Sequence, residues 1–462
     1  MLYDLLYPYQ KNIVDDLKNY DCGALFMDVG TGKSITSLAL YEQKQIQRKC
    51  NKLIIVCLCA KINEWKCDCE KWFPFSKVIV LDNKVKSKHD FLYRDFDIAI
   101  INFEKTWRYE DLRLIDNNFY IIIDESHKIK ESTTKVGNFM QQISLLTPYK
   151  CILTATPMGN GYIDLYNQLY FLGLISGSLK KFKDDYCNEQ IVYYPGMKPF
   201  KKIVGYHHTE YLDLLVNKYA RYYERKIDDD LIPTEIVIPF ELDKQYNKIA
   251  KTRVYEDISL DKVTSKRLGL KSLCSGTIMG NALVDPNGNL HREYQLNTYK
   301  LDWVKAFLED FNERVVIFYM FDHQREQLYD MISKMKRPVA RYCAEYKEED
   351  IFNENDNAVV LVQYKSGSTG IDWLKQSYIC IFYSLPDSYL EFYQAKGRIN
   401  RVGQTKKPLY YLLVAKGSNS VDEINYKALQ EKQDFNDQWF SNNFKEVWFL
   451  WQKGYIARGL EL

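Results

Sequence analysis

The sequence has no apolar run long enough to span a bilayer, no low-complexity segment and no repeat at a solenoid period. Glycine and proline are scarce, 21 + 12 = 33 of 462 residues, or about 7% where average usage gives about 12%. Hydrophobic residues make up 46%. These features exclude a collagen-like, linker-dominated or disordered chain. At roughly 150 residues per domain, they predict two or three domains that each bury most of their apolar surface.

Net charge is also nearly absent. Lys plus Arg number 63 and Asp plus Glu 61, so the balance is 63 − 61 = +2, and no segment resembles a polybasic arm. This balance argues against a protein that coats nucleic acid with a wide basic face. Contacts to a nucleic acid would have to be few and local.

The sequence lacks a signal peptide as well, since its first ten residues are mixed and aromatic. Its eleven cysteines are an odd number, and we expect free thiols in a reducing cytoplasm. Cys57 and Cys59, followed by Cys67 and Cys69, hold enough sulfur for a tetrahedral zinc site, but both pairs are C-x-C and not C-x-x-C. The first pair lies in the apolar run 53–60, so we favour buried thiols and keep zinc as the alternative.

Short apolar runs rich in β-branched residues alternate with longer mixed segments, and the alternation occurs twice. It predicts an α/β protein with two lobes, each a parallel sheet covered by helices. The expected strands of the first lobe are 24–27, 53–58, 78–81, 98–101, 120–123 and 151–153. Those of the second lobe are 315–319, 358–362, 378–383 and 409–414.

We expect the boundary between residues 229 and 230, where an acidic run is followed by Pro233, which disfavours helix in the residue before it. The first lobe, 1–229, would carry a helical insertion at about 162–225. The second lobe, 230–462, would carry one at about 240–297 and end in a helical segment.

A phosphate-binding loop is predicted at Gly30-Thr31-Gly32-Lys33-Ser34, between an expected strand and the helical pattern 35–41. A strand, a glycine turn and a helix start aim backbone N–H groups at an anion, and the helix dipole adds roughly half a positive charge. Lys33 would reach the β- and γ-phosphates of ATP, and Ser34 would hold Mg²⁺. The strict motif has a glycine where Met27 stands, so the match is to a relaxed form.

An acidic pair, Asp124 and Glu125, ends the apolar strand 121–123. Neighbouring residues at a strand end point to opposite sides, so Asp124 would hold Mg²⁺ while Glu125 acts as base or orients the attacking water. An isolated Asp-Glu pair is more often a solvated turn. The phosphate loop about 90 residues upstream favours the catalytic interpretation.

Hydroxyls follow the next expected strand, at Thr154 and Thr156. They could hydrogen-bond the acidic pair across neighbouring strand ends and report the state of the phosphate. A Thr-rich strand end with no such role explains them equally well without the other motifs.

Two arginines, Arg398 and Arg401, stand three residues apart, on one face if the segment is helical. Phosphoryl transfer needs positive charge at the γ-phosphate, and an arginine from a second lobe supplies it only when the lobes close. Surface ion pairs are the commoner role for such a pair. The framing by glycine and glutamine favours the catalytic role here.

Taken in order, these motifs resemble helicase superfamily two, and within it the Swi/Snf-type double-stranded DNA translocases. The resemblance extends from about residue 3 to about 430. It rests on the stretches 6–10 (the opening glutamine motif), 30–34 (motif one), 124–127 (the DExH box), 154–157 (motif three), 159–172, 366–372 (motif five), 394–404 (motif six) and 417–424.

The resemblance implies two RecA-like lobes with ATP bound in the cleft between them, and it assigns further roles. Gln10 would read adenine, and His127 would join the two threonines in coupling. The remaining implied roles are nucleotide binding by Gly370 and Asp372 and catalysis by Gln394 together with Arg398 and Arg401.

The sequence departs from the family pattern in three places. Tyr7 and Pro8 stand where an arginine usually precedes the opening Tyr-Gln, and Val29 follows Met27-Asp28 where an acidic pair is usual. The stretch 341–357 is short and lacks the expected Gly and Arg, which leaves the grip of the second lobe on DNA open.

The family tracks one strand of a duplex by its phosphates, and such contacts position without reading sequence. By correspondence, the expected contacts are Trp65 and Lys61, Asn102 and Glu104, and Ser366 and Thr369. Two stretches add local charge, 6 − 3 = +3 in residues 180–202 and 4 − 1 = +3 in residues 261–271. Aromatic residues in the first could stack on bases, although a solvated helical face is the commoner explanation of such runs.

The resulting hypothesis is an ATP- and Mg²⁺-dependent DNA translocase or helicase, a DNA-stimulated ATPase. We expect a monomer in the cytoplasm, at the nucleoid or in an infected host cell, from a bacterium or phage. Two alternatives stay open: a helicase that separates strands at forks or origins, and a nucleic-acid-binding scaffold switched by ATP with little hydrolysis. RNA also stays open as the track, because backbone contacts alone do not exclude it.

Overall fold

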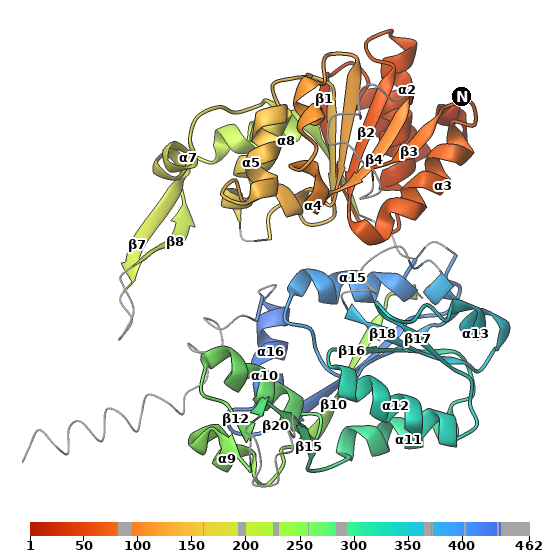
Figure 1. Ribbon diagram of the computed structural model, residues 1–462, viewed down its shortest axis with the longest axis vertical. Helices are drawn as coiled ribbons and strands as arrows, with labels where there is room; N and C mark the ends of the chain where they lie inside the picture. Colours follow the sequence, from red (N-terminus) through yellow and green to blue (C-terminus); the bar gives the residue numbers. More distant parts are fainter. Residues whose placement is uncertain are drawn as a thin grey trace, which may run out of the picture. The chain divides into compact units, whose positions relative to one another are not determined.

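The computed structural model describes residues 1–81, 95–159, 161–192, 200–224, 231–256, 258–282, 293–364, 371, 373–401, 403–431 and 434–435. The chain divides into two compact units, Met1–Lys226 and Ile227–Leu462. Each unit is built around one parallel sheet (Figure 1). The α/β fold class predicted from the sequence is therefore confirmed.

The sheet of unit 1 has seven parallel strands in the order β3-β4-β2-β5-β6-β1-β9. Every strand expected from the apolar runs is present. The strands are β1 (Cys22–Met27), β2 (Lys52–Cys57), β3 (Val78–Val80), β4 (Ile98–Asn102), β5 (Phe119–Asp124), β6 (Lys150–Thr154) and β9 (Ala220–Tyr223). The phosphate loop follows β1, and the acidic pair lies at the end of β5. Because β6 lies between β1 and β5, the carboxyl ends of all three meet at one edge.

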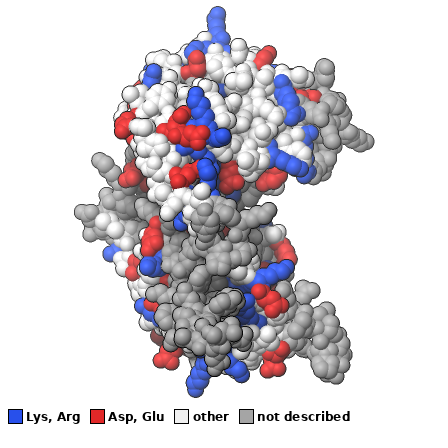
Figure 2. All heavy atoms as spheres, turned by 90° about the vertical axis from the view of Figure 1, so that its left-hand side faces the viewer, with Lys and Arg blue, Asp and Glu red and all other residues white. Residues whose placement is uncertain are grey.

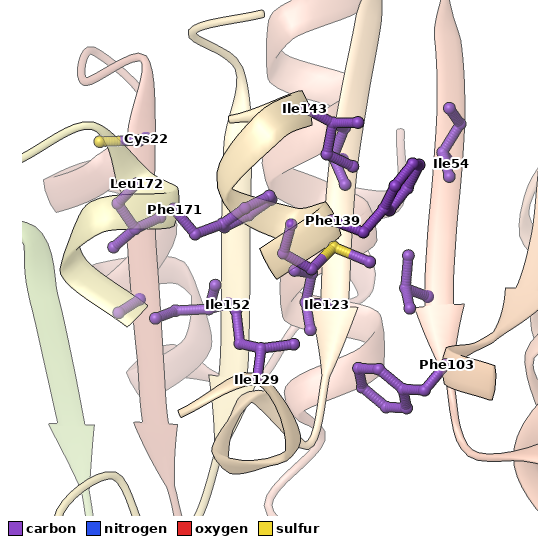
Figure 3. Packing of buried hydrophobic residues seen from close by; sticks show 14 of the residues in the cluster. Cys22, Ile54, Phe103, Ile123, Ile129, Phe139, Ile143, Ile152, Phe171 and Leu172 are labelled. Carbon is purple, nitrogen blue, oxygen red and sulfur yellow. The ribbon is translucent and has the colours of Figure 1, made fainter. Parts of the chain in front are cut away.

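Helices cover both faces of this sheet, which is why its central strands are apolar on both sides. On one face are α1 (Pro8–Leu17), α2 (Lys33–Ile46) and α3 (Ile62–Trp72), packed on Leu53, Ile55 and Ile122. On the other face are α5 (Lys135–Ile143), α6 (Leu165–Leu172) and α8 (Glu210–Tyr219), packed on Ile54, Ile121 and Ile123. Figure 3 shows side chains of α5 and α6, among them Phe139 and Phe171, turned toward β5 and β6. Each such buried side chain stabilises the fold by about 1.5–3 kcal/mol.

The region expected as a helical insertion, about 162–225, is mixed. It contains α6, α7 (Leu179–Tyr186) and α8, but also the antiparallel pair β7 (Cys187–Val192) and β8 (Phe200–Tyr206), and it ends in β9 of the main sheet. The hairpin extends away from the sheet of unit 1 (Figure 1). Remaining short elements of this unit are α4 (Phe103–Thr106) and the 3-10 turns Leu2–Leu5, Cys59–Lys61, Glu110–Leu114, Ser126–Ile129 and Tyr162–Asp164.

The sheet of unit 2 has six parallel strands in the order β10-β20-β19-β16-β18-β17. They are β10 (Thr234–Glu241), β16 (Val315–Tyr319), β17 (Val339–Tyr342), β18 (Val359–Gln363), β19 (Ile379–Phe382) and β20 (Leu409–Lys416). One face packs against α15 (Tyr389–Ile399) through Phe392, Ala395 and Ile399. The other packs against α11 (Tyr299–Asp310) and α12 (Asp322–Lys334). Three further elements lie around this sheet: α13 (Glu349–Glu354), α16 (Val421–Gln430) and the 3-10 turn Trp373–Gln376.

The second expected insertion, about 240–297, contains two helices and several short strands. The helices are α9 (Tyr246–Thr252) and α10 (Val263–Leu273). The strands are β11 (Val254–Tyr255), β12 (Ile258–Ser259), β13 (Thr277–Met279), β14 (Asn281–Ala282) and β15 (Glu293–Gln295). The apolar run 444–451, expected as part of a C-terminal helical segment, lies outside the described residues.

The surface in Figure 2 shows Lys and Arg side chains interspersed with Asp and Glu, and no single basic patch on that face. This mixture accords with the balance of +2 over the whole sequence. A search of the described residues finds no helix with the length and apolar character needed to cross a membrane.

Candidate functional site

The phosphate loop connects β1 to α2 and is shaped by two glycines. Gly30 and Gly32 have φ of 77° and 78°, in the left-handed region where glycine pays no steric cost. Gly32 is the residue before the first turn of α2, and a Cβ there would overlap the side-chain amide of Gln10. Thr31 closes the loop, its hydroxyl donating to the Asp28 carbonyl at 2.7 Å. The loop thus presents the N-terminus of a long helix to an anion.

Lys33 lies at the first position of α2, and its ammonium folds back onto the loop. Nζ donates to the carbonyls of Met27 at 2.9 Å and Asp28 at 3.0 Å. Burial lowers the pKa of Lys33, and the carboxylates of Glu125 and Asp124 oppose that shift. The structure therefore brings the lysine and the acidic pair into one electrostatic environment, as their motifs predict.

Gln10 lies directly against the phosphate loop. Its Nε2 donates to the Thr31 carbonyl at 3.1 Å, and its Oε1 accepts from the Tyr7 backbone N–H at 2.9 Å. The Tyr9 hydroxyl donates to the same Thr31 carbonyl at 2.9 Å, while the Tyr9 ring stacks on Tyr223 with 3.9 Å between centroids. Pro8 at the first position of α1 presets the helical φ and fixes where the glutamine points. The opening motif and the loop are thus one hydrogen-bonded assembly.

Asp124 is the last residue of β5 and is 3% exposed. The indole Nε1 of Trp65 donates to its Oδ2 at 3.0 Å. Burial raises the pKa of Asp124, and Lys61 opposes the shift, followed by the Trp65 hydrogen bond and Lys33. A divalent cation would favour the charged form of this buried carboxylate.

Glu125 follows with φ of 57°, so the chain turns sharply out of the strand and separates the two carboxylates. Its Oε2 lies 3.3 Å from His127 Nδ1. Burial alone would raise the pKa of Glu125, but the hydrogen bond and charge of His127, with Lys33 and Lys61, outweigh it and hold the pKa well below the usual range. Glu125 is therefore an ionised acceptor at neutral pH.

His127 connects the acidic pair to the end of β6. The same Nδ1 lies 3.3 Å from Thr154 Oγ1, which in turn accepts the Thr156 backbone N–H at 3.1 Å. The proton on the His127 ring is assigned from these hydrogen-bond partners. The predicted coupling residues thus meet, although Thr156 takes part through its backbone.

Helix α6 contributes residues that the sequence did not single out. Gln168 is fully buried, its Oε1 accepting the Ser126 hydroxyl at 2.6 Å and its Nε2 donating to the carbonyls of Pro157 at 2.9 Å and Asp164 at 2.8 Å. Asn167, beside it, donates to the Ile129 carbonyl. The loop after the acidic pair and the loop after β6 are thereby joined through one helix. Two adjacent amides in an otherwise apolar helix are the signal that could have indicated this.

The donors expected for Mg²⁺ are the Ser34 hydroxyl, in the first turn of α2, and the Asp124 carboxylate. Both are oxygen ligands, which Mg²⁺ prefers, and it commonly takes only one or two from protein and the rest from phosphates and water. Within the described part of the chain, no cluster of three or more His, Cys, Asp or Glu residues could hold a metal by itself. The donor set fits Mg²⁺ bound together with a nucleotide.

Of the nucleic-acid contacts expected in unit 1, Trp65 and Asn102 are 1% and 6% exposed. Trp65 faces the core from α3 and its indole is bonded to Asp124, so the structure corrects its assignment to the nucleic acid. Asn102 ends β4, and its Oδ1 is buried with no hydrogen-bond partner among the described residues. Ser366 and Thr369, like Gly370 and Asp372, lie outside the described residues.

In unit 2, Gln394 and Arg398 lie on α15 and are 5% and 2% exposed. Arg401 lies just beyond that helix, where its Nε donates to the Gly397 carbonyl at 3.1 Å. Because α15 ends at Ile399, the two arginines do not share a helix face: Arg398 lies on the helix and Arg401 beyond its end. The catalytic role of all three residues stays a prediction.

The basic stretch 261–271 is mostly internal and not a surface for DNA. Lys266, Arg267 and Lys271 are 4%, 8% and 0% exposed. Arg267 and Lys271 both pair with Asp387, which precedes α15, and Arg267 also donates to the Phe435 carbonyl at 3.2 Å. A charge count along the sequence could not distinguish such a buried cluster from a solvated face.

All eleven cysteines are free, and only Cys59 and Cys67 are exposed. Cys57 lies in β2 and Cys69 faces the core from α3. Burial raises the pKa of the Cys69 thiol to about 12. The buried-thiol interpretation therefore holds for Cys57 and Cys69, whereas Cys59 lies in the 3-10 turn after β2 and is exposed.

A glycine loop, an acidic pair and a threonine at three neighbouring strand ends of a parallel sheet define a nucleotide-binding α/β protein of the phosphate-loop kind. A family model described as the SNF2-related domain matches residues 9–261, more than half of the 462 residues. The chain belongs to this family. The kinship predicted from the motifs is confirmed, and with it the class of enzyme, that of the SNF2-type ATPases.

Relatives match most of this chain at low identity. The chain is 22% identical over 432 residues to the "CHD3-type chromatin-remodeling factor CHR7" of Arabidopsis thaliana, covering 85% of this chain and 34% of that protein. It is 24% identical over 446 residues to an "Uncharacterized ATP-dependent helicase" of Mycoplasma pneumoniae, covering 89% and 39%. The chain therefore spans well under half the length of these two relatives.

Among solved structures, one similar to this chain is described as "Sulfolobus solfataricus SWI2/SNF2 ATPase core in complex with dsDNA". The identity is 20%, the TM-score 0.44, and the alignment covers 95% of this chain and 92% of that one.

Proposed function

We propose that the chain is a DNA-stimulated ATPase that converts hydrolysis into movement along duplex DNA. The observation that carries the proposal is the meeting of Lys33, the acidic pair and the His127–Thr154 contact at one edge of the unit 1 sheet. Membership of the SNF2-related family supports it.

In this proposal the loop N–H groups and Lys33 would bind the phosphates, and Ser34 and Asp124 would hold Mg²⁺, which would supply positive charge to the phosphoryl oxygens. Glu125, held ionised, orients the attacking water and accepts its proton. His127 transmits the change at Glu125 to the end of β6 through Thr154. Arg398 and Arg401 would contribute positive charge from unit 2 once ATP and DNA are bound, and Gln394 would contribute a neutral amide that hydrogen-bonds.

The proposal is tested by measuring ATP hydrolysis with no nucleic acid, single-stranded DNA, duplex DNA, forked DNA and RNA. We expect the largest stimulation from duplex DNA, and loss of hydrolysis in Lys33→Ala. Displacement of the third strand from a triplex without opening of a fork would identify movement without strand separation. ATP binding with negligible hydrolysis under all conditions would contradict the proposal and favour a switched scaffold.

A further inference from the structure

Trp65 lies inside unit 1, not at its surface. Its side chain is 1% exposed and its indole Nε1 donates to Asp124 Oδ2 at 3.0 Å. Within the described residues, no other group donates a hydrogen bond to this carboxylate. Because an indole nitrogen is a donor only, the bond fixes which way the carboxylate of Asp124 turns.

The beginning of α3 also supplies the countercharge of the site. Lys61, the residue before the helix, lies 3.5 Å from Glu64 Oε1, and its side chain is 16% exposed. Its positive charge acts on both Asp124 and Glu125, and at Asp124 it is the largest influence opposing burial. One turn of helix therefore gives the acidic pair both a hydrogen-bond donor and a cation.

The same helix has an outer face. Asn63, Cys67 and Glu70, spaced four and three residues apart, are exposed while Trp65 and Cys69 face the core. The packing of this inner face on the core therefore holds the Trp65 indole in place beside Asp124.

We infer that Trp65 is a positioning residue that orients the Asp124 carboxylate toward the Mg²⁺ site. The inference deepens the proposed function and rests on it, since Asp124 acts through Mg²⁺. It reverses the role expected from the sequence, because Trp65 acts on the metal-binding carboxylate instead of on nucleic acid.

The test compares Trp65→Phe, which keeps an aromatic ring and removes the N–H, with Trp72→Phe at the far end of the same helix. Binding of a fluorescent ADP analogue is measured over a range of MgCl₂ concentrations. Residues that hydrogen-bond a metal ligand without touching the metal typically contribute about 10–100-fold to metal affinity. We expect Trp65→Phe to need about tenfold more Mg²⁺ for the same gain in nucleotide affinity, with Mg²⁺-free binding unchanged. Trp72→Phe should match the wild type in both.

A second arm needs no stable variant. In an ¹⁵N-indole spectrum of the wild type, which has eight tryptophans, one indole resonance should move when Mg²⁺ is added to the ADP complex. If Trp65→Phe folds, that resonance should be the one it removes. In the Asp124→Asn background, Trp65→Phe should cause no further loss of the Mg²⁺ effect.

Equal Mg²⁺ dependence in Trp65→Phe and wild type overturns the inference, as does a spectrum in which no indole responds to Mg²⁺ although the nucleotide binds. Neither result touches the proposed function as long as the wild type hydrolyses ATP on DNA. Conversely, absent hydrolysis in the wild type would overturn the proposed function even if the indole resonance responded.

Discussion

Glu125 combines an uncommon backbone conformation with a lowered side-chain pKa. A φ of 57° is costly for a residue with a side chain, of the order of 1–3 kcal/mol, and such residues persist where the surroundings hold them. Here the turn sends Glu125 toward His127 while Asp124 stays in the strand with Trp65. The backbone conformation is therefore what gives two adjacent carboxylates different partners.

Replacing Glu125 by glutamine should separate binding from turnover. The change keeps the shape of the side chain but removes the acceptor charge, so hydrolysis should fall by about 10²- to 10⁴-fold while ATP still binds. Steady-state ATPase assays with duplex DNA and equilibrium binding of ATP measure the two quantities. Glu131→Gln, an exposed acid in the same region, is the matched control. Normal DNA-stimulated turnover in Glu125→Gln would remove Glu125 as the base.

His323 should make the stability of unit 2 depend on pH. The ring is 7% exposed, its Nε2 lies 3.3 Å from Ser272 Oγ, and burial lowers its pKa to about 4 against a weaker opposing effect of Asp322. Since the unfolded chain binds the proton more tightly, the stability is fully present above pH of about 6.5 and is lost as pH falls toward 4.

The expected loss from His323 over this interval is about 3 kcal/mol in the free energy of unfolding. Urea unfolding of wild type and His323→Gln from pH 7 to pH 4 measures it, with His208→Gln, an exposed histidine of unit 1, as control. The free energies of unfolding of wild type and His323→Gln should diverge as the pH falls, and those of wild type and His208→Gln should stay parallel. Parallel pH profiles for His323→Gln and wild type would contradict the assignment.

At the scale of elements, α6 is the link between two loops of the candidate site. Gln168→Leu would keep the volume but leave the Ser126 hydroxyl and the Pro157 carbonyl without their partner. Each buried polar group that loses its hydrogen bond costs about 1–3 kcal/mol. We therefore expect thermal or urea unfolding to show that the free energy of unfolding falls by about 2 kcal/mol or more. Hydrolysis per folded molecule should fall as well, because the two loops would no longer be held in their relative positions.

Gln141→Leu on the neighbouring helix α5 is the comparison for Gln168→Leu, since the Gln141 amide makes only a 3.4 Å contact with the Tyr166 hydroxyl. It should leave stability and hydrolysis close to those of the wild type. A Gln168→Leu protein with full hydrolysis and reduced stability would show that α6 is structural only.

The strands that the sequence predicted and those it missed differ in position. All central strands carried continuous apolar runs, because helices cover both faces of each sheet. Within the two main sheets the missed strands are β9, β10 and β17, and each lies at the edge of its sheet, although the edge strand β3 was predicted. An edge strand is partly exposed, as in the alternation of half-buried and exposed residues along β10, and so has no uniform apolar signal.

The candidate site divides in the same way. Motif spacing was sufficient to predict the phosphate loop and the acidic pair, because each lies where a strand ends. The threonine expected to hydrogen-bond the acidic pair, Thr154, contacts His127 instead. The partners Trp65 and Gln168 depend on which side of a helix meets which strand, and that is decided by tertiary packing. The apolar periodicity of a helix predicts which face is buried, but it does not predict which polar group that face contacts.

At the scale of the whole molecule, the charge balance is only +2, and some of the cations that it counts are buried and not available to a ligand. Lys266, Arg267, Lys271 and Lys300 are buried, and Asp387 and Asp422 pair with three of them. These charges are occupied in holding unit 2 together and cannot neutralise phosphates. The exposed Lys202 on the β7–β8 hairpin is one of the cations left for such a role.

A charge balance of only +2 implies few phosphate contacts and therefore weak salt dependence of DNA binding. Each neutralised phosphate adds about 0.9 to the slope of log K against log salt, so three or four contacts give a slope of about −3. Titrations of duplex DNA over a series of NaCl concentrations measure this slope. Lys202→Gln should make it shallower by about one unit if the hairpin touches the backbone, and Lys262→Gln, exposed at the start of the otherwise buried basic stretch, should leave it unchanged. A slope that corresponds to about ten phosphates would require a basic surface beyond the described residues.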